Sequence, residues 1–217
     1  MAIAYDAVSV GLKAPSGTGP LVFSHTCSGS DRILLVGCFT TAGDVVTGAT
    51  YGGVSMTLIA KYAAGTEYVY LYYLIAPSTG ANDISISWSG STILRGHGVS
   101  YTGANQSAQP DAYGTKSETS SNTISASLTT IADNSWVLMM VRSEGDITAG
   151  NNTTLRGVST TSNILDRGAA TTPAGSETLE AICIASLYAI IASIAPVGSV
   201  VTSTVTPQNN LAMLGVS

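Results

Sequence analysis

The sequence predicts an all-β protein: an antiparallel, jelly-roll-like β-sandwich of roughly eleven to thirteen strands, built as a single domain over residues 1–217. Three observations predict this fold. Apolar and polar residues alternate with a period of two along many segments. Clusters of Gly, Pro, Asn, Asp and Ser interrupt these segments at short intervals. Charged residues make up 10% of the chain, too few to cover the outer faces of long helices.

Three segments alternate most clearly and are predicted to be strands with one buried face and one solvent-facing face. In DISISWS, the side chains of Ile84, Ile86 and Trp88 share one face and polar side chains take the other. The same pattern occurs in TISASL (Thr123–Leu128) and in SVVTSTVT (Ser199–Thr206).

Three further segments are apolar on both faces and are predicted to be central strands: Arg32–Phe39, Ser135–Val141 and Ala181–Ala195. The third segment lies between Glu180 and Pro196 and is shorter than the stretch of about 20 apolar residues that spans a membrane. We therefore expect no membrane insertion. This run is either a pair of buried strands or one long central strand.

Composition narrows the function classes. The net charge is −5, from 8 basic and 13 acidic residues, so no basic stripe is available to neutralise a nucleic-acid backbone. The first residues, MAIAYD, show no basic segment followed by an apolar one, so we expect synthesis in a cytoplasm without a signal peptide. Cys27, Cys38 and Cys183 match no disulfide or zinc spacing and are predicted to be small buried side chains.

The block from Arg32 to Gln106 resembles a β-sandwich family common in phage-encoded and environmental bacterial proteins. The segments that carry the resemblance are RILLVGCF, VTGATYGGVSMTLIA, YVYLYYLIAPSTGANDISISWSG and VSYTGANQ. SWVLMMV (Ser135–Val141) and NNLAMLGVS (Asn209–Ser217) are similar to strands of that family's second half and end. The resemblance implies a virion surface protein or an adhesive module, and it carries no catalytic residues over to this chain.

Candidate catalytic residues are scarce. His25, in LVFSHTC, and His97, in RGHGVS, are the two histidines, and either is a general base if a carboxylate and a serine lie beside it. No nucleophile motif accompanies them, so we interpret both as ordinary strand or loop residues. The acidic residues show no metal-ligand spacing. The sequence thus predicts a protein that is not an enzyme and that needs neither a cofactor nor a metal.

The feature with the most functional content is a tyrosine ladder, defined as Tyr68, Tyr70 and Tyr72 in EYVYLYYL. Alternation places these three side chains on one face of a strand. Three interpretations stay open: a structural face of the sandwich, an interface between subunits, or a platform on which sugar rings stack.

The leading functional hypothesis is a non-enzymatic phage virion protein, a capsid decoration or a tail- or fibre-associated component. It assembles as a homo-oligomer with other virion proteins through apolar burial and strand-edge pairing. The alternative is a carbohydrate-binding or adhesive module that recognises a host cell-surface glycan. That alternative predicts an exposed groove lined by at least two tyrosines, or by Trp88 or Trp136.

Overall fold

The computed structural model describes residues 2–12, 19–119, 121–157, 161–183 and 187–200. Within these residues the chain forms seventeen β-strands, all paired antiparallel, and no helix. The predicted all-β sandwich is confirmed. The predicted number of strands was too low, partly because three of the strands span two residues each, too few to show a period.

The first part of the chain forms two sheets. The first inner sheet has the strand order β1-β9-β3-β7-β6, and the first outer sheet has the order β2-β8-β4-β5. Their bounds, in chain order, are β1 (Ala4–Leu12), β2 (Leu21–Cys27), β3 (Ile33–Thr40), β4 (Val46–Tyr51), β5 (Val54–Ser55), β6 (Thr57–Ala64), β7 (Glu67–Ile75), β8 (Gly80–Trp88) and β9 (Leu94–Thr102).

The second part of the chain forms two more sheets. The second inner sheet has the order β10-β17-β12-β15-β14, and the second outer sheet has the order β11-β16-β13. Their bounds are β10 (Ala112–Glu118), β11 (Thr123–Thr129), β12 (Trp136–Arg142), β13 (Thr148–Ala149), β14 (Thr154–Leu155), β15 (Ser162–Asp166), β16 (Ser176–Ile182) and β17 (Leu187–Ile194).

The pairing in the first part is that of a jelly roll. The first strand pairs with the last (β1 with β9), the second with the one before it (β2 with β8), and the third with β7, while β4 pairs with its neighbour β5. This nested order results when one long hairpin of strands is rolled into two facing sheets. We call the unit formed by β1–β9 the first sandwich and the unit formed by β10–β17 the second sandwich.

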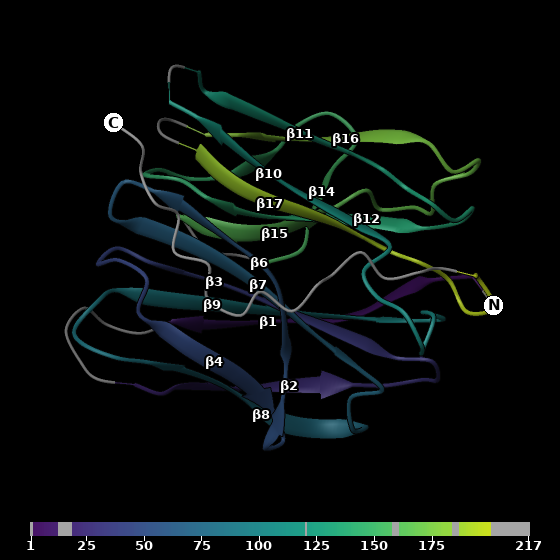
Figure 1. The fold of residues 1–217 in the computed structure, drawn as a ribbon, viewed down its shortest axis with the longest axis horizontal. Helices are drawn as coiled ribbons and strands as arrows, with labels where there is room; N and C mark the ends of the chain where they lie inside the picture. The colour runs from purple at the N-terminus through teal and green to yellow at the C-terminus, as the bar shows by residue number, and fades with distance from the viewer. Residues whose placement is uncertain (1, 13–18, 120, 158–160, 184–186, 201–217) are drawn as a thin grey trace.

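The four sheets stack as layers, from β2, β8 and β4 at one side to β11 and β16 at the other (Figure 1). Three apolar cores separate them. Leu34 and Val36 lie in the core inside the first sandwich, and Val137 and Met139 lie in the core inside the second. Side chains from both inner sheets, Leu35 and Leu138 among them, fill a third core between the two sandwiches.

Two of the three alternating segments are confirmed as strands. DISISWS lies almost entirely in β8 with Ile84, Ile86 and Trp88 buried, and TISASL lies in β11. Of the segment Ser199–Thr206, the two described residues, 199 and 200, form no strand, and the rest lies outside the described residues, as does Asn209–Ser217.

The predicted central strands are also confirmed. β3 pairs on both sides, with β7 and β9, and β12 pairs on both sides, with β15 and β17. The run Ala181–Ala195 contains the end of β16 and all of β17, which lie in different sheets, so the two-strand interpretation is correct. No helix long and apolar enough to cross a membrane occurs in the described part of the chain.

Candidate functional site

The tyrosine ladder lies inside the first sandwich. β7 turns Tyr70 and Tyr72 toward the first outer sheet, where they are 1% and 5% exposed. Tyr68 is half-buried, and its ring stacks on that of Tyr70 with centroids 6.2 Å apart. The ladder therefore packs as part of the core, which favours the structural interpretation over an exposed platform.

The hydroxyl group of Tyr70 is engaged within the protein. It donates a hydrogen bond to Asp44 Oδ1 at 2.8 Å, and the other oxygen of Asp44 pairs with Lys61. Burial raises the pKa of Tyr70 well above its ordinary value, and the negative charge of Asp44 raises it further. The phenol therefore stays neutral and acts as a donor.

A polar network at the β1–β2 corner is the arrangement closest to a catalytic site. His25 on β2 is 2% exposed and lies between two hydroxyl groups. Its Nδ1 is 2.9 Å from Ser9 Oγ on β1, and its Nε2 is 3.0 Å from Ser100 Oγ on β9. Ser100 Oγ donates in turn to Asp6 Oδ2 at 2.7 Å.

The donors in this network fix the tautomer of His25. The one hydroxyl proton of Ser100 goes to Asp6, so Ser100 accepts from His25 Nε2–H. His25 Nδ1 then accepts the hydroxyl proton of Ser9. A glycine at 98 permits this approach, because a Cβ there would lie 3.0 Å from Ser9 Oγ and 2.5 Å from the Ile84 side chain.

In this network Ser9 is placed as a nucleophile would be and His25 as its general base, but His25 is a weak base. Burial lowers the pKa of His25 to about 4, against a smaller opposing effect of the Asp6 carboxylate. A hydrolase also needs a pocket beside the serine and donors for the oxyanion. A pocket in the described part of the chain lies elsewhere and includes none of these four side chains.

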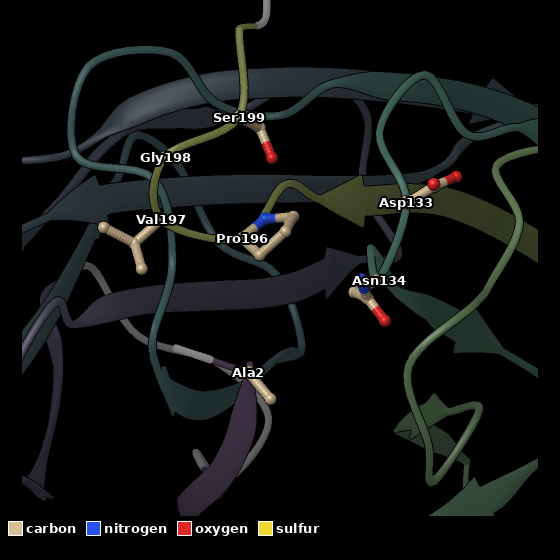
Figure 2. A pocket seen from close by; sticks show the side chains of 7 residues that line it. All are labelled: Ala2, Asp133, Asn134, Pro196, Val197, Gly198 and Ser199. Atoms are coloured by element: carbon tan, nitrogen blue, oxygen red, sulfur yellow. The ribbon is translucent and has the colours of Figure 1, made fainter.

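This pocket lies where the chain following β17 passes the turn before β12 (Figure 2). It has a volume of about 460 Å³ and is lined by Ala2, Asp133, Asn134 and residues 196–199. Asp133 is its one charged residue, and Oδ1 of this carboxylate already accepts the Ala174 amide at 2.6 Å. The lining offers little to orient a ligand.

His97 occupies a different position, at the boundary between the two sandwiches. It is fully buried on β9, and its Nε2 is 2.8 Å from Ser162 Oγ on β15. Its Nδ1 has no partner among the described residues and faces Gly157, where a Cβ would lie 3.0 Å away. Burial lowers the pKa of His97 to about 4, with a further contribution from Arg95.

Asp111 is a buried carboxylate that the sequence did not single out. It lies just before β10, is fully buried, and accepts hydrogen bonds from Ser193 Oγ, from Ser135 Oγ at 2.9 Å and from the Ile131 amide at 3.2 Å. The carboxylate therefore ties the turn before β12 to β17.

Asp6 likewise ties a turn to the last strand in the first sandwich. Besides Ser100, it accepts the Ser28 amide at 2.9 Å and the Ser28 hydroxyl, which ties the turn before β3 to β9. Burial raises the pKa of Asp6, but the hydrogen bonds from Ser28 and Ser100 outweigh it and the net pKa is lowered. No sequence signal marks Asp6, Ser9, Ser100 or Asp111, because the residues that each of them bonds are far away in the sequence and form no motif with it.

The three cysteines are buried, as predicted, and form no disulfide with one another. Comparisons with known proteins give no relative: no family model, no curated protein and no solved structure matches the chain.

Proposed function

We propose that the chain is a non-enzymatic structural protein of a phage virion, a capsid decoration or a tail- or fibre-associated component. It acts through contacts with copies of itself and with other virion proteins. The observation that carries this proposal is that the side chains best suited to bind or react with a ligand are buried and bonded within the fold. These side chains are His25, His97, Tyr70 and Asp111. Function is thereby left to the outward surfaces.

The outward faces of the two outer sheets suit protein contacts. Exposed Ser and Thr side chains line both faces, including Ser24 and Thr26 on β2 and Ser125 and Ser127 on β11. Short hydroxyl side chains lose little rotamer freedom when a partner covers them. Few ions need to be desolvated, because 10% of the chain is charged.

Exposed apolar side chains add to this surface. Leu12 at the end of β1 is 64% exposed and Val22 on β2 is 49% exposed. Their strands lie in contact at the corner where the first sandwich closes. Burial of apolar side chains of this size drives protein association.

The fold itself supports the proposal by analogy, because jelly rolls recur in viral capsids, although they also occur in lectin domains. Glycan binding gains no support from the aromatic residues. Trp88 and Trp136 are each 6% exposed and Tyr72 is 5% exposed, so none presents a ring face for a sugar.

Sedimentation velocity across a concentration series tests the proposal. We expect a discrete homo-oligomer whose contacts bury more than about 1,000 Å². Val22→Lys is expected to weaken it, whereas Ile131→Lys, equally exposed in the turn before β12 and outside the two outer sheets, serves as the matched control. A monomer at the highest soluble concentration, combined with glycan binding by the intact protein, would favour the adhesive alternative.

A further inference from the structure

The second sandwich repeats the first strand for strand. Read across the sheet, the strands β10, β17, β12, β15 and β14 take the places that β1, β9, β3, β7 and β6 take in the first inner sheet. In the outer sheets, β11-β16-β13 repeats β2-β8-β4. The single difference among the described strands is β5, which has no counterpart.

Individual residues repeat as well. Asp6 is the third residue of the first strand of its sandwich, and Asp111 immediately precedes the first strand of the other. Each accepts a hydrogen bond from the turn between the second and third strands. Both also accept from a serine on the last strand, Ser100 in one case and Ser193 in the other. We call each of these arrangements an aspartate clamp.

The turn held by each clamp has the same backbone feature. Asp31 has a φ of 50° and Asn134 a φ of 62°, and each lies two residues before the third strand of its sandwich. Asp and Asn are the non-glycine residues that most readily adopt this left-handed conformation. The two turns therefore share their shape although their sequences, SGSDR and IADNS, differ.

Several contacts between the sandwiches are reciprocal. β7 contacts β12 and β17, and the equivalent strand β15 contacts β3 and β9, while β3 contacts its own equivalent, β12. Ala104 and Pro196, each two residues past the last strand of its sandwich, form an antiparallel bridge. Equivalent elements exchanging contacts in this way are the mark of a two-fold interface.

The buried faces resemble a dimer interface in composition. Apolar side chains fill the centre, including Leu35 and Leu71 from the first sandwich and Ile190 from the second. Polar pairs also cross the boundary: Arg142 with Glu67 at 2.7 Å, Tyr101 with Asp166 at 2.7 Å and Tyr62 with Ser117 at 3.0 Å. An apolar interface that also contains hydrogen-bonded pairs is typical of stable associations.

We propose that the face of the first inner sheet is a docking surface for a second jelly roll, and that this chain holds both partners of a two-fold dimer in one polypeptide. The two sandwiches are then separate folded units whose association does not require the covalent link at residues 103–111. This inference does not depend on the proposed virion role, because a monomeric chain would carry the same internal dimer.

Cleavage of the full folded chain tests this proposal. A protease recognition sequence is inserted after Ser107, which is exposed, with a second insertion after Ala108 in case the first prevents folding. After cleavage we expect the two fragments to elute together. Mixed with an isotope-labelled preparation, they should exchange partners in dilute urea while the β-sheet circular dichroism signal is retained. Native mass spectrometry reads the exchange, and the uncut insertion protein is the control.

Two glycines provide matched variants. A Cβ at Gly37 would lie 2.6 Å from Met140 Sδ across the boundary, and a Cβ at Gly96 would lie 2.6 Å from Ile86 Cδ1 inside the first sandwich. Gly37→Leu is expected to raise the dissociation constant of the cleaved halves at least about tenfold, because overpacking opens the boundary. Gly96→Leu should change it less than about threefold while lowering the stability of the first sandwich.

The proposal is overturned if the fragments separate only as the β-sheet signal is lost, or if they never exchange partners under conditions that preserve it. Equal effects of the two glycine substitutions on the dissociation constant would also overturn it. The same experiment tests the prediction that residues 1–217 fold as a single domain.

Discussion

The two sandwiches share a scaffold but differ in what they bury. His25 and Leu128 each lie eight residues before the third strand of their sandwich, and both side chains point inward. His97 and Ile190 each lie three residues before the serine of the aspartate clamp. The first sandwich thus carries both histidines where the second carries aliphatic residues. The same fold accommodates a histidine or an aliphatic residue at these positions. Because only the first sandwich has histidines there, we expect acid to destabilise that sandwich and its boundary with the second.

The largest effect is expected at the clamps. Asp111→Ala should lower the free energy of unfolding by about 3–5 kcal/mol, because it leaves several buried donors without an acceptor. Asp6→Ala should cost about 1–2 kcal/mol, because Asp6 is partly exposed and water replaces the lost acceptor. Urea denaturation measures both.

Asp133→Ala is the control for this pair, since its carboxylate is exposed and accepts one amide. Equal losses at Asp6 and Asp111 would show that burial does not separate the two clamps.

Acid is expected to have the next largest effect. The unfolded histidine pKa is about 6.5, whereas His25 and His97 each have a folded pKa of about 4. Above the unfolded pKa both states are neutral and stability is full. As pH falls from about 6.5 to about 4, the unfolded chain binds protons that the folded chain excludes, so the free energy of unfolding drops by up to about 3 kcal/mol per histidine.

Denaturation at a series of pH values between about 7 and about 4, the range set by the unfolded and folded histidine pKa values, checks this dependence. His97→Gln is expected to remove about half of the pH dependence while keeping a side chain that can bond Ser162. A His97→Gln variant with the full dependence of the original protein would show that the boundary histidine does not titrate in this way.

A smaller effect is expected in the tyrosine ladder. Tyr70→Phe removes the hydrogen bond to Asp44 and should cost about 1–2 kcal/mol. Tyr72→Phe should cost less than about 0.5 kcal/mol, because no described residue bonds its hydroxyl group. Thermal unfolding distinguishes the two variants. If either substitution weakened self-association but left the thermal stability unchanged, the tyrosine ladder would be exposed at an interface between subunits.

The sequence predicts strands well wherever burial differs between faces. The alternation in DISISWS gives the inward side chains of β8 directly, and the unbroken apolar runs correctly indicate central strands. Burial of Tyr70 and Tyr72 was one of three open interpretations, because alternation states that residues share a face and not which face is covered.

The duplication could not be predicted from the sequence. The two sandwiches preserve topology while their core residues differ, as His25 differs from Leu128, so no repeat is visible at the level of residues. The aspartate clamps could not be predicted either, because their residues are far apart in the sequence. Asp6 and Ser100 lie at opposite ends of the first sandwich in sequence and meet through the pairing of β1 with β9.

Hydrogen–deuterium exchange of the intact protein at about pH 7 and about pH 5, corrected for the intrinsic rate, tests the contrast between the sandwiches most directly. The account predicts that acid lowers protection in β2 and β9, which carry the histidines, and in β15, which His97 contacts. Protection in β11 and β16 should stay unchanged. Uniform loss across both sandwiches, or greater loss in β11 and β16, would contradict it.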